Sequence, residues 1–144
     1  MENHRDDLVV ILAGYTDEME VLMQGNSGLR SRIPYSIEFP NFTKDELYRI
    51  FIDMVGKKHK YDETLAEAAK RYFDSIPDSV LNQKSFSNAR FVRNLYERTW
   101  AKASMRCQLE GTNKTVFTKD DFERASQEKE FDFGATNRRP KIGF

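Results

Sequence analysis

Cysteine and histidine are scarce in this chain of 144 residues. The single cysteine, Cys107, excludes an internal disulfide framework, which fits a reducing compartment. Because it falls within a long helical pattern, we expect it to be a small packing residue. The two histidines, His4 and His59, stand far apart, so no cluster has the spacing of metal ligands and the sequence predicts no metal site.

Long hydrophobic runs and an excess of charge of one sign are absent as well. No stretch approaches the ~18 apolar residues that span a membrane, and the opening Met1-Glu-Asn-His-Arg-Asp-Asp does not resemble a signal peptide. Lys plus Arg total 23 and Asp plus Glu total 23, whereas a general nucleic-acid binder usually carries a basic excess. We therefore expect a cytoplasmic protein with neither a nucleic acid nor a membrane as its partner.

The first forty residues follow the order strand, helix, strand. Leu8–Ala13 is short, wholly apolar and rich in β-branched residues, which is typical of a strand buried on both faces of a parallel sheet. Thr16 is expected to cap a short helix over residues 17–23, and Ser36–Phe39 is a second strand candidate that a proline ends. This order predicts a βαβ unit, with the loop 25–34 between its helix and its second strand.

From about Asn41 the pattern becomes helical. Thr43 and Glu46 form a capping box at the start of one helix, and a second helix begins at Asp62 or Thr64. Apolar residues recur along one face of this second helix at helical spacing. They are Leu65, Ala68, Ala69, Tyr72, Phe73 and Ile76.

Further helices follow the proline that ends this stripe. Residues 78–86 are polar and read as irregular, and Ser87 is expected to cap a long helix that reaches about Glu110. Thr118 caps a last short helix to about Gln127. The sequence thus predicts an α/β remnant followed by an α-helical bundle of about four helices.

The loop Gly25–Pro34 presents two arginines, Arg30 and Arg32, between small flexible residues and a proline. Cations on a polar turn commonly just face water, which is one interpretation. The other is an arginine that contacts phosphate on another molecule, because a guanidinium group matches phosphate oxygens bidentately.

A second arginine pair opens the long helix. If Ser87 is the cap, Arg90 lies in the first turn and Arg93 one turn later. A cation near a helix N-terminus is disfavoured by roughly 0.3–1 kcal/mol. Pairing of Arg93 with Glu97 is one explanation, but it leaves Arg90 unexplained. The functional alternative is that Arg90 and the helix N-terminus together face a phosphate.

Several separated stretches resemble one protein family. Met1–Tyr15, Asn26–Arg32 and Ile37–Pro40 resemble the AAA+ ATPases of the red-type Rubisco activase and stage V sporulation protein K group, and Phe86–Asn94 resembles the sensor 2 region of that group. The closing Arg138–Phe144 looks like a tail found among its members. The similarity covers nearly the whole chain.

This resemblance implies a fold and a domain organisation. It implies the C-terminal part of an AAA+ P-loop ATPase core followed by its four-helix lid domain. The core part would be residues 1–41, with the sensor 1 strand, the arginine-finger loop and the last strand. The lid with sensor 2 would be residues 42–128, and residues 129–144 would be a tail.

The resemblance also implies roles for the arginines. ATP in this family lies between two subunits of a hexameric ring, and an arginine finger reaches the γ-phosphate that the neighbour holds. Arg32 matches the finger position best and Arg30 is the next candidate. Arg90 matches sensor 2, which reaches the phosphates from the lid of the same subunit, and Arg93 joins it as a cofactor-binding candidate.

The sensor 1 position departs from the common AAA+ pattern. A polar Asn, Ser or Thr usually stands at the end of that strand, whereas this chain continues Ala13-Gly-Tyr15-Thr16. By resemblance we assign sensor 1 to Tyr15 or Thr16.

Two motifs of a complete ATPase do not occur in the sequence. It contains no Gly-x-x-x-x-Gly-Lys-Ser/Thr stretch and no apolar run that ends in Asp-Glu, so nothing cradles the phosphates or holds Mg²⁺. We therefore expect the C-terminal portion of a longer ATPase that uses ATP and Mg²⁺, while this chain alone binds neither and is inactive. In the family core a further strand lies between those of Leu8–Ala13 and Ile37–Phe39, so these two should not pair.

The expected function is remodelling of an unidentified protein partner, coupled to ATP binding and hydrolysis in a ring of identical subunits. An alternative is a non-enzymatic helical interaction module that docks on an AAA+ ring or regulates it. A helix-turn-helix DNA binder is disfavoured, because acids on the long helix offset its basic residues in a chain of zero net charge.

Overall fold

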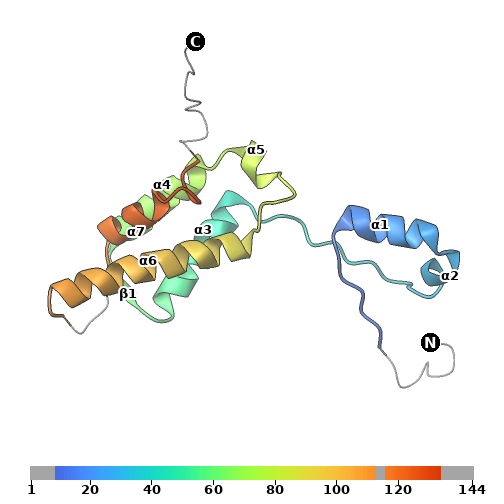
Figure 1. The fold of residues 1–144 in the computed structure, drawn as a ribbon, viewed down its shortest axis with the longest axis horizontal. Helices are drawn as coiled ribbons and strands as arrows, with labels where there is room; N and C mark the ends of the chain where they lie inside the picture. The colour runs from blue at the N-terminus through green and yellow to red at the C-terminus, as the bar shows by residue number, and fades with distance from the viewer. Residues whose placement is uncertain (1–8, 113–115, 134–144) are drawn as a thin grey trace, which may run out of the picture. The chain divides into compact units, whose positions relative to one another are not determined.

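The computed structural model describes residues 9–112 and 116–133. The chain divides into two compact units, Met1–Pro40 and Asn41–Phe144, and each is described by itself (Figure 1). In the first unit the described residues contain helices α1 (Thr16–Gly25) and α2 (Ser27–Arg30). The helices of the second unit are α3 (Lys44–Gly56), α4 (Glu63–Ser75), α5 (Asp78–Leu81), α6 (Ala89–Leu109) and α7 (Lys119–Ser126).

The two strands expected in the first unit are wrong for the residues that the structure describes. Residues 9–13 and 36–39 form no strand, and their apolar side chains are exposed, 84% at Ile11 and 88% at Phe39. A strand persists only where neighbouring strands satisfy its backbone groups, and the described part of this unit contains no sheet. As expected, the two segments do not pair with each other.

The helices of the first unit also differ from the expectation. The cap position of α1 is held by Tyr15, whose side chain makes no capping hydrogen bond, so the predicted cap by Thr16 is wrong. Asp17 and Glu18 lie in the first turn, where negative charge is favourable next to the helix dipole. Helix α2 occupies part of the segment expected to be a flexible turn.

The capping signals predicted for the starts of α3 and α7 are confirmed. Thr43 and Glu46 cap α3 reciprocally, and Thr118 does the same for α7 with Asp121. Of the two candidates for the start of α4, Asp62 is the cap, because its carboxylate accepts the Leu65 N–H at 2.8 Å. Two short elements were not expected, namely α5 within the segment read as irregular and a small sheet.

Four helices form the bundle. Helix α6 packs on α3 and α7, and α4 packs on the same two helices (Figure 1). Phe51 lies at the centre, with its ring 5.9 Å from that of Phe73 and 5.2 Å from that of Phe122. Phe131 is also fully buried, and its carbonyl accepts the Tyr72 hydroxyl at 2.7 Å. The core therefore continues past the last periodic residues of the sequence.

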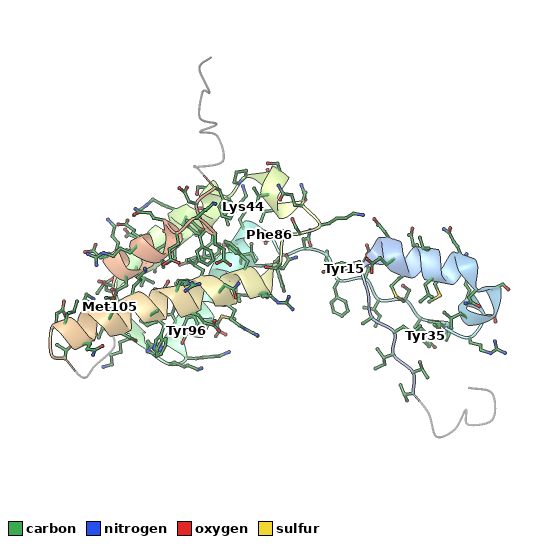
Figure 2. All side chains as sticks on the ribbon, in the orientation of Figure 1. Tyr15, Tyr35, Lys44, Phe86, Tyr96 and Met105 are labelled. Carbon is green, nitrogen blue, oxygen red and sulfur yellow. The ribbon has the colours of Figure 1, made fainter. Side chains whose placement is uncertain are left out.

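A small sheet joins the loop between α3 and α4 to the segment just before α7. Strands β1 (Lys60–Tyr61) and β2 (Val116–Phe117) pair in parallel, with Lys60 opposite Val116. Two residues are too few to show a strand period, which is why the sequence gives no sign of them. Side chains that stay outside the core include Tyr35 in the first unit and Met105 on α6 (Figure 2).

Candidate functional site

The start of α6 is an unusual turn. Arg90 donates its backbone N–H to the Ser87 carbonyl at 2.9 Å, which closes a turn over residues 87–90. Asn88 occupies its first central position with φ 48° and ψ −120°, the conformation that a type II′ turn requires there and that glycine usually supplies. Helix α6 begins at Ala89, so Asn88 holds the cap position and the predicted cap by Ser87 is wrong.

Asn88 does not cap the helix with its side chain. Its Oδ1 instead accepts the backbone N–H of Phe42 at 3.0 Å, and its Nδ2 donates to Oδ1 of Asn41 at 2.9 Å. Asparagine at this position commonly accepts a hydrogen bond from the first turn of the helix. Because its carboxamide is turned to the linker, the first turn of α6 receives no such bond from Asn88.

The predicted sensor arginines lie on this helix start. Arg90 and Arg93 are both exposed and occupy the first two turns of α6. In the part of the chain that the structure describes, Arg93 forms no ion pair with Glu97, so the pairing considered from the sequence does not explain this cation. Two exposed cations beside a helix N-terminus make a local positive field that suits an anion such as phosphate.

The predicted finger arginines lie in the first unit. The guanidinium Nη1 of Arg32 donates to the Gly28 carbonyl at 3.1 Å, and its backbone N–H donates to the Leu29 carbonyl at 3.0 Å. Arg30 is the last residue of α2 and is exposed. Arg30 thus ends α2, and Arg32 follows two residues later with its side chain bonded back to a carbonyl of that helix.

The sensor 1 candidates flank the start of α1. Tyr15 is 72% exposed, and its carbonyl accepts the Met19 N–H at 2.9 Å. Thr16 is the first residue of the helix and is exposed. Their role in nucleotide sensing stays a prediction. The closing Arg138–Phe144 motif lies outside the described residues.

The described residues offer cationic donors but no cluster of metal ligands. Exposed guanidinium groups are the kind of donor that matches phosphate oxygens, whereas no group of three or more His, Cys, Asp or Glu side chains in the described ranges could hold a metal ion. A search of the same residues finds no helix with the length and apolar character that crossing a membrane requires. We therefore assign no Mg²⁺ ligand within the described ranges.

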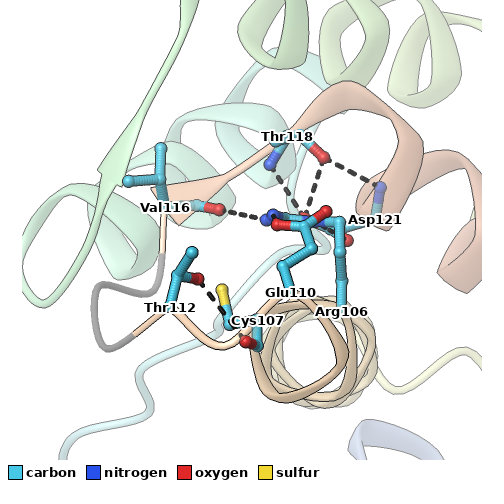
Figure 3. A network of polar contacts seen from close by, with 7 residues as sticks. All are labelled: Arg106, Cys107, Glu110, Thr112, Val116, Thr118 and Asp121. Atoms are coloured by element: carbon cyan, nitrogen blue, oxygen red, sulfur yellow. Dashed lines mark hydrogen bonds and ion pairs between the residues drawn. The ribbon is translucent and has the colours of Figure 1, made fainter.

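The opposite end of α6 carries a polar network that the sequence analysis missed (Figure 3). Arg106 donates through Nη2 to the Val116 carbonyl at 2.7 Å and through Nη1 to Glu110 at 3.0 Å. It also donates to the buried carboxylate of Asp121, which completes the capping box of α7 with Thr118. Burial alone would raise the pKa of Asp121, but hydrogen bonds from Arg106 and Thr118 outweigh it and hold that pKa below its ordinary value.

The bundle is thus a helical domain with two exposed cations at the start of its longest helix. A family model described as the AAA lid domain matches residues 43–132. The chain belongs to the AAA lid domain family.

Longer proteins from several organisms resemble the chain. Protein CbbX of Cereibacter sphaeroides is 46% identical over 98 residues, which cover 68% of this chain and 31% of that protein. A protein CfxQ homolog of Galdieria sulphuraria is 40% identical over 121 residues, 84% of this chain and 38% of that protein. The ESX-3 secretion system protein EccA3 of Mycolicibacterium smegmatis is 37% identical over 131 residues, 84% and 21% respectively.

The expected AAA+ family is confirmed by the lid-domain match and by the likeness to the CbbX and CfxQ proteins, which are of the red-type Rubisco activase kind. The chain spans well under half of the length of the curated relatives it matches.

Proposed function

We propose that the chain acts as the C-terminal part of a hexameric, cytoplasmic AAA+ ATPase, which couples ATP binding and hydrolysis to the remodelling of a protein partner. The catalytic Mg²⁺ and the phosphate-binding loop would come from the rest of that enzyme. The chain's own contribution would be two sets of cations. One set would act on the ATP of the same subunit and the other on the ATP of its neighbour.

The observation that carries this proposal is the start of α6. Arg90 and Arg93 are exposed there without the Arg93–Glu97 ion pair that would have explained one of them. A helix start of this kind favours a bound anion by its dipole, its backbone N–H groups and its cations at once. In an AAA lid, ATP phosphate is the anion that this arrangement serves best, so we assign Arg90 the sensor 2 role and Arg93 a supporting one.

Arg32 would act on the ATP that the neighbouring subunit holds. An arginine finger stabilises the charge of the transition state, and its contribution to the rate is on the order of 10³–10⁵. In the structure Arg32 donates to the Gly28 carbonyl, so reaching a γ-phosphate would exchange this hydrogen bond for a charge-assisted one. Arg30, exposed at the end of α2, is the second candidate.

A chimaera tests the proposal. The upstream part of protein CbbX is joined to this chain, so that together they cover the length of that relative once, and ATP hydrolysis and ATP affinity are measured. We expect the chimaera to hydrolyse ATP. Arg90→Ala is expected to weaken ATP binding or slow hydrolysis at least about tenfold, which corresponds to a loss of about 1.4 kcal/mol of interaction.

A matched cation on the same helix provides the control. Arg98 is exposed and lies 3.5 Å from Glu128 in a surface ion pair, which contributes little, so Arg98→Ala should leave ATP binding and hydrolysis unchanged. Equal hydrolysis and affinity in the Arg90→Ala and unaltered chimaeras would contradict the sensor assignment. A chimaera that assembles and binds ATP but never hydrolyses it would favour the non-enzymatic interaction module instead.

A further inference from the structure

The linker between the two units is attached to the helix that carries the sensor arginines. The second unit begins at Asn41, and two of its first residues bond to Asn88. Phe42 donates its N–H to the Asn88 carboxamide oxygen at 3.0 Å, and the Asn88 amide donates to Oδ1 of Asn41 at 2.9 Å. Asn41 also donates to the Leu81 carbonyl at 3.2 Å. The linker is thereby bonded to the end of α5 and to the turn before α6, which lie 40 to 47 residues further along the chain.

Asn88 forms these bonds from a backbone conformation that costs free energy. Its φ of 48° is the one positive value found for a non-glycine residue in the described ranges, and a side chain in such a conformation usually costs of order 1–3 kcal/mol. Glycine would relax the turn, yet asparagine stands there and does not cap the helix with its side chain. Its carboxamide instead makes the two hydrogen bonds to the linker, and its amide also donates to the Phe86 carbonyl at a longer 3.4 Å.

We infer that Asn88 is a positioning residue, which ties the interdomain linker to the first turn of α6 so that a displacement of the linker is transmitted to Arg90. The tie consists of two hydrogen bonds in series. The Phe42 N–H binds the Asn88 side chain, and the turn that contains Asn88 is closed by the Arg90 N–H, which donates to the Ser87 carbonyl at 2.9 Å.

The consequence for function rests on the proposed function. If Arg90 contacts ATP phosphate, a movement of the first unit that pulls on residues 40–42 alters the placement of that contact, and ATP binding in turn biases the linker. The mechanical tie itself does not depend on ATP, and it is tested on this chain without nucleotide.

The test compares amide hydrogen exchange in the unaltered 144-residue chain and in Asn88→Gly. Glycine accepts both a helix cap position and φ 48° without strain, so the turn and the fold should persist. We expect the Phe42 amide to exchange at least about tenfold faster, while the Arg90 amide and the core amides of α3 keep their rates. Asn88→Asp retains an acceptor for the Phe42 N–H and should restore much of its protection.

Asn82→Gly is the matched control, because Asn82 is exposed on the preceding loop and ends α5. It should leave the Phe42 amide unchanged. An unchanged Phe42 rate in Asn88→Gly would overturn the inference. Equal acceleration of Phe42 and the α3 core amides would overturn it too, since Asn88 would then act only on global stability.

Transmission to the arginine is read from chemical shifts. Asn41→Ala should shift the amide resonances of Ala89 and Arg90 in the unaltered background and leave them unmoved in the Asn88→Gly background. Shifts of the same size in both backgrounds, or none in either, would overturn the inference. The proposed function fails by a different result, the absence of an Arg90 effect on ATP in the chimaera, so the two failures are distinguishable.

Discussion

Arg106 on α6 donates two hydrogen bonds to the Asp121 carboxylate at the start of α7, from Nε at 3.1 Å and from Nη2 at 2.9 Å (Figure 3). The Asp121 side chain is only 3% exposed, and its carboxylate also accepts the backbone N–H and the hydroxyl of Thr118. One carboxylate thus completes the capping box of α7 with Thr118 and joins this helix to α6. This contact fixes the end of α6 that lies farthest along the helix from the sensor arginines.

Loss of the carboxylate should therefore destabilise the lid. Asp121→Ala removes the carboxylate half of the α7 capping box and leaves the Arg106 guanidinium without its buried partner, so we expect the free energy of unfolding to fall by about 2–4 kcal/mol. Urea unfolding followed by circular dichroism measures it. Glu123→Ala on the same helix breaks only the exposed pair with Lys119, 3.6 Å long, and should cost less than about 1 kcal/mol. Equal losses in the two variants would refute a special role of Asp121.

The stability of the lid should decrease as the pH falls from about 7 to 5. Burial, with a smaller effect of the neighbouring Lys58, lowers the pKa of His59 from its ordinary 6.5. A group whose pKa is lower in the folded state stabilises the fold above its unfolded pKa, and that stability is lost as the pH falls through the folded pKa. The urea midpoint should follow this curve.

His59→Phe tests the assignment of that pH dependence. The imidazole is stacked on Phe117 with ring centroids 4.6 Å apart, so phenylalanine preserves a stacking ring but cannot be protonated. The decrease in the urea midpoint between pH 7 and 5 should become shallower in the variant. An equally steep decrease would place the titrating group elsewhere.

Gly28 should control where the Arg32 side chain lies. A Cβ at this position would come within 3.0 Å of Arg32 Nη1, the same nitrogen that donates to the Gly28 carbonyl. Gly28→Ala is therefore expected to displace the guanidinium, and its protons should exchange faster with water in ¹⁵N NMR spectra. Gly25→Ala meets nothing within 4 Å and should leave the Arg32 signals unchanged. Identical guanidinium exchange in all three proteins would count against the contact.

Phe131 should be as important to the lid as the residues of its helices. It is fully buried, and the centroid of its ring lies 5.5 Å from that of Phe91 on α6, in an edge-to-face arrangement. Phe131→Ala should reduce the free energy of unfolding by about 3–5 kcal/mol. Leu109→Ala at an 81% exposed position should change it by no more than about 0.5 kcal/mol. A loss at Phe131 as small as that at Leu109 would show that this residue is not part of the core.

Structural features that depend on residues close together in the sequence could be predicted, whereas features that depend on distant residues could not. A capping box needs only residues three positions apart, so Thr43 with Glu46 and Thr118 with its partner were predictable. The apolar stripe of α4 likewise follows from its own spacing. Phe131 gave no such signal, because its burial depends on the surface that α4 and α6 offer to it.

The prediction of two strands was wrong because a strand depends on neighbours that lie outside its own segment. The apolar run at residues 9–13 has the composition of a central strand, but composition does not supply the neighbours that a strand requires. The tie between Asn88 and Phe42 joins residues 46 positions apart, so no short-range rule could find it. The exposed arginines of α6 were predictable as candidates, since their unfavourable position next to the helix dipole is visible in the sequence.

In the proposed function, Arg32 acts on ATP that a neighbouring subunit holds. The direct measurement is the hydrolysis rate of the Arg32→Ala chimaera, alone and mixed with a chimaera that keeps Arg32 but cannot bind ATP in its upstream part. We predict a loss on the order of 10³–10⁵ for the variant alone, and a partial return of hydrolysis in the mixture although neither component is active by itself. Full hydrolysis by the Arg32→Ala chimaera, or a mixture as inactive as its components, would contradict the claim.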